Sequence, residues 1–186
     1  MLSAMAQLDI LFTGYVSGGV AGTISLIRDA DRIIVVDPGM VPDRSAILDP
    51  LAALEVDPRE VTDVIMSHHH PDHTWHIALF PHIRLHDYWA TYTGDVWDSR
   101  PAEGFRVSPG VGLLETPGHT REDITTVVET EDGVAALTHL WWNGDIAGDP
   151  RAWDLEQLKH HRTRVLDLAD LIVPGNGPPF PAHAAP

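Results

Sequence analysis

The chain has 186 residues, 44% of them hydrophobic and 21% charged, which is enough for the core of one globular domain. Its formal net charge of −15 opposes binding to long nucleic acids and to anionic membranes, and no apolar run approaches the roughly 20 residues that span a bilayer. It lacks cysteine, which excludes disulfides and thiolate metal sites, and its N-terminus shows no signal-like segment. We therefore expect one cytoplasmic domain over residues 1–186, with a loosely ordered tail from about residue 178.

The first third of the chain predicts strands around one helix. Strands are expected at residues 8–12 and 61–66, and a hairpin at residues 23–36 runs into the turn Asp37-Pro38-Gly39. A helix is expected from Asp43, a good N-cap residue, because apolar side chains then recur at helical spacing.

The rest of the chain predicts more strands and a second helix. Residues 77–104 show no clean period, so we expect a short strand and a long loop whose aromatic side chains form a pocket wall. Strands are expected at residues 105–107, 111–115 and 171–173, and a hairpin at residues 124–142 ends at Asn143-Gly144-Asp145. Asp149-Pro150 predicts the start of the second helix.

One stretch, His68-His69-His70-Pro71-Asp72-His73, concentrates metal-ligand side chains directly after the apolar residues Val64-Ile65-Met66. Proline disfavours the helical region for the residue before it, so His70 should be extended and should share a side with His68. Pro71 suits the first position of a helix, which places Asp72 and His73 in its opening turn. This junction predicts a metal site, since clustered imidazoles repel one another unless a metal binds between them.

These residues resemble the metallo-β-lactamase superfamily. Its His-x-His-x-Asp-His signature stands here as His68, His70, Asp72 and His73, and Thr116-Pro117-Gly118-His119-Thr120 resembles the next ligand motif. The order and spacing of the motifs are similar from about Asp9 to Phe180. The resemblance implies an α/β (α+β) fold, a four-layer αββα sandwich with metals at one edge of two sheets.

The resemblance also implies a ligand set for one or two ions, Zn²⁺ first and iron or manganese as alternatives. The first ion would be held by His68, His70 and His119, and the second by Asp72, His73 and a final histidine. Gly144-Asp145 resembles the family's bridging aspartate, and Asp37 its supporting residue. The final histidine is replaced by Asn176, a weak ligand beside imidazole, and His183 is a substitute nearby in sequence.

The hypothesis favoured by these residues is a metal-dependent hydrolase, in which a metal-activated hydroxide attacks a small ester, lactone, thioester, amide or phosphodiester. Asp72 would be the catalytic residue that orients the nucleophile and shuttles its proton. The C-terminal part is especially similar to one subgroup of the family, which implies RNA phosphodiester cleavage as an alternative. The acidic chain favours a small-molecule substrate over nucleic acid.

A second alternative is an oxidoreductase resembling persulfide dioxygenases, in which His68, His119 and Asp145 bind one iron. The sequence contains no feature that indicates an oligomeric state. The histidines outside the motifs are expected to be core or surface residues: His76, His82, His86, His139, His160 and His161.

Overall fold

Two mixed β-sheets face each other in the computed structural model, which describes residues 5–186. The N-terminal residues 1–4, included above in the search for a signal segment, lie outside the described part. The first sheet has the order β1-β4-β5-β6-β7-β8-β9. Its strands are β1 (Gln7–Phe12), β4 (Ile24–Asp29), β5 (Arg32–Val36), β6 (Asp63–Ile65), β7 (Arg84–His86), β8 (Ala90–Thr93) and β9 (Val96–Ser99).

The second sheet has the order β10-β11-β12-β13-β14-β15. Its strands are β10 (Arg106–Ser108), β11 (Val111–Glu115), β12 (Ile124–Thr130), β13 (Gly133–Thr138), β14 (Leu171–Pro174) and β15 (Phe180–Pro181). A separate small hairpin pairs β2 (Tyr15–Val16) with β3 (Val20–Ala21). The α-helices are α1 (Ser45–Ala53), α2 (Pro71–Thr74) and α3 (Leu155–Leu166), and short 3₁₀ turns cover Pro58–Glu60, Ile77–Leu79 and Ala182–Ala184.

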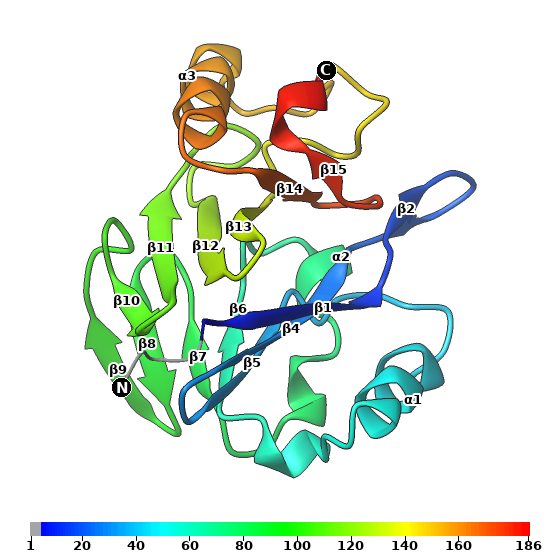
Figure 1. Ribbon diagram of the computed structural model, residues 1–186, viewed down its shortest axis with the longest axis vertical. Helices are drawn as coiled ribbons and strands as arrows, with labels where there is room; N and C mark the ends of the chain where they lie inside the picture. Colours follow the sequence, from blue (N-terminus) through cyan, green and yellow to red (C-terminus); the bar gives the residue numbers. More distant parts are fainter. Residues whose placement is uncertain (1–4) are drawn as a thin grey trace.

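The layers follow from the alternation of side chains along the strands. In β5, Ile34 packs between the two sheets whereas Val35 packs on the outer face with Leu51 of α1. In β14, Val173 faces the other sheet and Ile172 packs on the side of α3. Helices α1 and α3 therefore lie on opposite outer faces (Figure 1), and the predicted four-layer αββα sandwich is confirmed. Each fully buried aliphatic side chain contributes about 1.5–3 kcal/mol to this core.

The segment at residues 77–104 differs from its prediction. It forms three strands, β7 to β9, instead of one strand and a long loop. Every residue of β9 is exposed, including Trp97 at 63%, so neither face of this edge strand needs an apolar pattern. The segment also supplies none of the described residues that line the cavity beside His70 and Asp72, so the predicted pocket wall is not found there.

Two further predictions shift in position. Helix α3 begins at Leu155, capped by the side chain of Asp154, and not at Asp149-Pro150. In the segment beyond residue 178, for which a loosely ordered tail was expected, Phe180–Pro181 form β15, which pairs with β14, and Ala182–Ala184 form a 3₁₀ turn. No helix in residues 5–186 is both long enough and apolar enough to cross a membrane.

Candidate metal centre

The histidine stretch lies where β6 meets α2, as the sequence predicts. Strand β6 ends at Ile65, His70 is extended (φ −69°, ψ 145°), and Pro71 is the first residue of α2. The other site residues also follow strand ends: Asp37 follows β5, His119 follows β11 and Asn176 follows β14. The loops at one edge of the two sheets thus bring together side chains that are up to 139 positions apart in the chain (176 − 37).

Three imidazole nitrogens converge at this edge. The Nδ1 atom of His70 lies 3.0 Å from Nε2 of His68 and 3.1 Å from Nε2 of His119. Two nitrogens bound to one tetrahedral zinc ion at 2.0–2.1 Å are about 3.3 Å apart. The three side chains therefore fit a metal ion after small shifts.

The protonation of these rings also suits a metal. Burial, reinforced by the neighbouring imidazoles, lowers the pKa of His68 well below its usual value, and burial lowers the pKa of His70 as well. Both rings are therefore neutral at pH 7 and have a free lone pair, which is the form that binds a metal.

A carboxylate that the sequence did not single out as a site residue orients His119. Oδ2 of the buried Asp149 lies 2.7 Å from Nδ1 of His119. Although burial alone would raise the pKa of Asp149, hydrogen bonds from His119 and from the N–H of Arg151 lower it. Asp149 is thus an ionised acceptor that keeps the proton of His119 on Nδ1 and leaves Nε2 free for a metal. The motif Asp149-Pro150 is a common helix start, which hid this role.

Replacing Asp149 should therefore weaken metal binding without removing a ligand. For Asp149→Ala we expect an affinity for Zn²⁺ or Co²⁺ about 10–100-fold lower, measured by competition with a chelator. Asp154→Ala is the control, because the side chain of Asp154 caps α3 by accepting from the N–H groups of Glu156 and Gln157. Equal metal affinity in the two variants would contradict this role of Asp149.

A second group contains Asp72, His73 and His139. Nδ1 of His73 lies 2.9 Å from Oδ2 of Asp37, which also accepts hydrogen bonds from the backbone and hydroxyl of Ser67. Burial would lower the pKa of His73, but the carboxylates of Asp37 and Asp72 raise it to about 9. Its buried Nε2 has no hydrogen-bond partner within residues 5–186 and lies 3.3 Å from Asp72. Asp37 therefore contacts the site from the position that the sequence suggested.

A cavity of about 510 Å³ opens onto this cluster. Its polar lining consists of His70, Asp72, His119, His139, Asn176 and Arg151. Its apolar lining comes from the β2–β3 hairpin, Met40 and Trp142. A mostly apolar cleft with a few convergent polar groups is the usual form of a small-molecule site.

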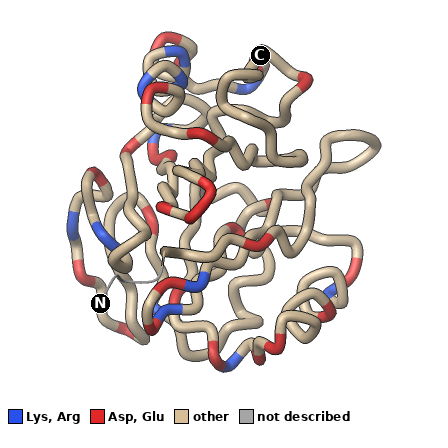
Figure 2. Tube along the Cα trace, viewed as in Figure 1, with Lys and Arg blue, Asp and Glu red and all other residues tan. Residues whose placement is uncertain are grey.

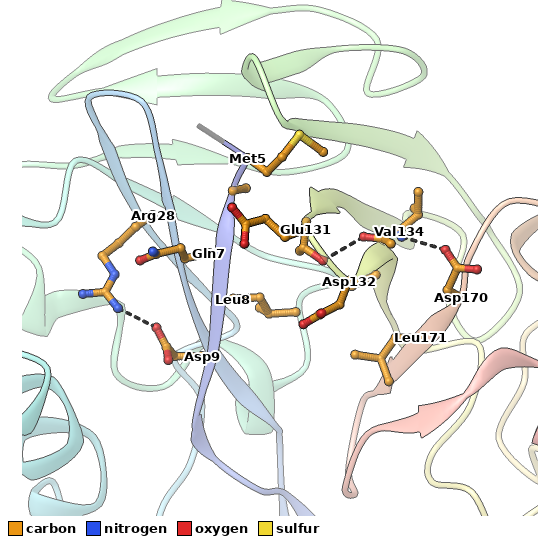
Figure 3. Close-up of a pocket in the computed structure, with 14 residues that line it drawn as sticks. Met5, Gln7, Leu8, Asp9, Arg28, Glu131, Asp132, Val134, Asp170 and Leu171 are labelled. Atoms are coloured by element: carbon orange, nitrogen blue, oxygen red, sulfur yellow. Dashed lines mark hydrogen bonds and ion pairs between the residues drawn. The ribbon is translucent and has the colours of Figure 1, made fainter. Parts of the chain in front are cut away.

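A second cavity, of about 530 Å³, lies between β1 and the β12–β13 turn (Figure 3). Several carboxylates surround it, but Asp9 pairs with Arg28 at 2.9 Å, and Asp170 accepts a hydrogen bond from the N–H of Val134. None of the site residues expected from the sequence lines it in the described structure. The histidine-lined cavity is therefore the candidate active site.

Comparison with known proteins agrees with this geometry. The family model described as "Metallo-beta-lactamase superfamily" matches residues 17–161. Metallo-beta-lactamase domain-containing protein 1 of Xenopus laevis is 32% identical over 168 residues, which cover 86% of this chain and 72% of that protein. The human protein of the same name is 35% identical, with 87% and 65% covered. The chain belongs to the metallo-beta-lactamase superfamily.

Solved structures show the same superfamily fold. A Thermotoga maritima protein described as a metallo-beta-lactamase has a TM-score of 0.77 at 21% identity, covering 95% of this chain and 99% of that one. An N-acyl homoserine lactone hydrolase, solved with N-hexanoyl-L-homoserine at its catalytic metal center, has a TM-score of 0.68 at 18% identity, with 95% and 94% covered. The chain is thus a metallo-beta-lactamase-fold hydrolase with a histidine-rich site, and it spans about two thirds of the human relative's length.

The structure does not bring together every ligand that the superfamily resemblance implies. Asp145, expected as the bridging ligand, is exposed, and its N–H bonds Oδ1 of Asn143 within a turn. His139 instead belongs to both groups whose ligand atoms lie within 4.8 Å of one another, one with His68 and His119 and one with Asp72 and His73. Among the described residues, neither group contains Asp145, and His70 joins the first only through the contacts of its Nδ1. The reason is that β13 ends at Thr138, not at Trp142 as the sequence suggested, so His139 is the first residue beyond the strand.

His139 is thus, after Asp149, a second site residue that the sequence interpretation missed. The other histidines expected in core or surface positions, and the exposed His183, are in neither group within residues 5–186. No sequence signal marked His139, because the predicted strand continued to Trp142. The observed end of β13 at Thr138 is what places His139 directly after a strand, as the motif residues are.

Proposed function

We propose that this superfamily member hydrolyses a small, partly apolar substrate that carries an anionic group, with Zn²⁺ as its metal. The observation that supports the proposal is the cavity that combines convergent histidines and Asp72 with apolar walls and one arginine. His68, His70 and His119 would hold the ion. A divalent metal in such a site lowers the pKa of water and polarises a carbonyl or phosphoryl oxygen.

Asp72 is the residue that would handle the proton. It lines the cavity, and its Oδ2 accepts a hydrogen bond of 3.1 Å from Nδ2 of Asn176. Burial would raise its pKa, but the close contact with His73 at 3.3 Å and the charge of that ring, together with the hydrogen bond from Asn176, lower it strongly. The ionised carboxylate can therefore accept a proton from the attacking water and pass it to the leaving group.

The cavity walls favour a small substrate with an apolar part. Val16 and Val20 of the β2–β3 hairpin, together with Met40 and Trp142, supply the apolar surface. The hairpin contains no charged residue (Figure 2). A long RNA strand would need several cations along its path, whereas Arg151 is the one arginine or lysine among the described lining residues. Lactones and other acyl esters are therefore the substrates to test first.

Arg151 is suited to bind the anionic group of the substrate. Its side chain forms no ion pair with a carboxylate within residues 5–186, whereas six of the eleven arginines of this acidic chain do. A hydrogen bond between charged partners contributes about 1.5–3 kcal/mol. The free guanidinium therefore distinguishes anionic from neutral substrates.

For Arg151→Ala we expect KM for carboxylate-bearing esters or lactones to rise about 10–100-fold, with little change in kcat. Neutral analogues should be unaffected. Arg121→Ala is the matched control, because Arg121 stacks on Trp153, 5.0 Å from its ring centroid, and is absent from the cavity lining. An equal rise in KM for neutral and anionic substrates would contradict the assignment.

The proposed function itself is tested with metal-loaded protein on a panel of ester, lactone, thioester and phosphodiester substrates. We expect hydrolysis of at least one small acyl substrate and none of structured or single-stranded RNA. Stoichiometric iron with oxygen uptake on a persulfide would contradict the hydrolase proposal.

A further inference from the structure

His139 is buried, with 3% of its surface exposed, at the meeting point of the other site rings. Its ring stacks on that of His119 with centroids 4.1 Å apart, and its centroid lies 4.6 Å from that of His68. Its Nδ1 atom is buried and has no hydrogen-bond partner among the described residues. A buried nitrogen without a partner costs about 1–3 kcal/mol, so this atom needs an explanation.

The side chain of Asn176 defines the protonation of His139. Its Nδ2 lies 3.0 Å from the backbone oxygen of Ala21 and 3.1 Å from Oδ2 of Asp72, both of which are acceptors. The amide nitrogen must therefore point towards them, which turns Oδ1 towards Nε2 of His139 at 3.0 Å. Because Oδ1 only accepts, Nε2 of His139 carries the proton and Nδ1 has the free lone pair.

We propose that Nδ1 of His139 is a metal ligand, that Asn176 is the residue that positions it, and that each chain consequently binds a single ion. This inference rests on the proposed metal dependence and concerns the ligand set of the same site.

The single ion follows from the number of lone pairs. His139 belongs to both candidate groups, one with His68 and His119 and one with Asp72 and His73. A carboxylate has two oxygens and can bridge two ions, but an imidazole whose Nε2 is protonated offers one lone pair. The two groups are therefore alternatives and cannot both be filled through His139.

Of the two groups, the one with His68 and His119 is better suited to bind that ion. Those two histidines already converge on Nδ1 of His70 at 3.0 and 3.1 Å, and their ligand atoms also lie within 4.8 Å of that of His139. His139 would thus add one imidazole to this set, and a further coordination position would stay open for the water that hydrolysis needs. The other group contains the close contact of 3.3 Å between His73 and Asp72, each of which is also held by a second partner. Asp72 and His73 thus remain a charge pair beside the ion.

The test measures metal content, not activity. Metal-free protein is titrated with Zn²⁺ and with Co²⁺, and bound metal is quantified by mass spectrometry after gel filtration. We expect one ion per chain for the wild type and two for the double variant His139→Asp/Asn176→His, which supplies a bridging carboxylate and an imidazole. Two ions in the wild type would overturn the inference alone, whereas no bound metal would overturn the proposed function as well.

The visible spectrum of bound Co²⁺ tests the two residues separately. His139→Ala and Asn176→Ala should each alter the Co²⁺ bands and lower the affinity, the latter by about 10–100-fold. His76→Ala is the control, because Nδ1 of His76 lies 2.7 Å from the backbone oxygen of Gly39 and is bonded to it. The Co²⁺ spectrum of this variant should match that of the wild type. If Asn176→Ala lowers the Tm but leaves the Co²⁺ bands unchanged, Asn176 is only structural and the inference fails.

Discussion

Chelation of the bound ion should abolish hydrolysis and lower the Tm by about 8–16 °C. A ligand present at about 1,000 times its Kd stabilises the folded state by about 4 kcal/mol, and each kcal/mol changes the Tm of a chain of this size by about 2–4 °C. The physical reason is that a bound ion would be shared by ring nitrogens that lie 3.0–3.1 Å apart and would give a partner to Nδ1 of His139, which has none in the described structure.

The measurement is calorimetry and an activity assay before and after dialysis against a chelator, followed by addition of Zn²⁺. Activity and Tm should return together when the ion is restored. His119→Ala should behave like the chelated protein even with Zn²⁺ present. Full activity in metal-free protein would contradict the proposed function.

Loss of Asp63 should cause the largest destabilisation outside the site. This carboxylate, fully buried in β6, receives two hydrogen bonds from Arg84, at 2.9 and 2.8 Å, and one of 2.8 Å from His86. Asp63→Ala leaves both partners without their acceptor, which costs about 3–5 kcal/mol and lowers the Tm by about 6–20 °C.

The matched control is Glu129→Ala, which breaks an exposed ion pair of 3.0 Å with Arg106. Side chains about half exposed are screened by water, so this variant should lose less than about 1 kcal/mol. Chemical denaturation of the two metal-loaded variants gives both free energies of unfolding. Similar losses would show that the buried carboxylate does not hold β6 to β7.

The sequence predicted those parts of the fold that are under strong local constraint. Pro71 restricts His70 and begins α2, and the alternation of Ile34 and Val35 in β5 separates two cores. Edge strand β9 escaped prediction because both of its faces are exposed, so burial imposes no pattern on it.

The same distinction holds for the candidate site: residues in local motifs were predicted, and residues placed by strand ends or distant contacts were not. The histidines of the signature and His119 converge because their motifs specify the loops that carry them. The position of His139 depends on where β13 ends, and apolar residues that continue past Thr138 to Trp142 conceal that boundary. The role of Asp149 depends on a contact across 30 positions, for which no local pattern exists.

The pairing of β13 with β14 has an evolutionary consequence. The two strands run parallel with Thr138 opposite Pro174, and a side chain at Gly175 would overlap the ring of His139. A histidine at 139 without an amide at 176 would lose the acceptor of its proton, and an asparagine at 176 without that histidine would be a poor ligand. We therefore expect His139, Gly175 and Asn176 to be kept or lost together among related chains.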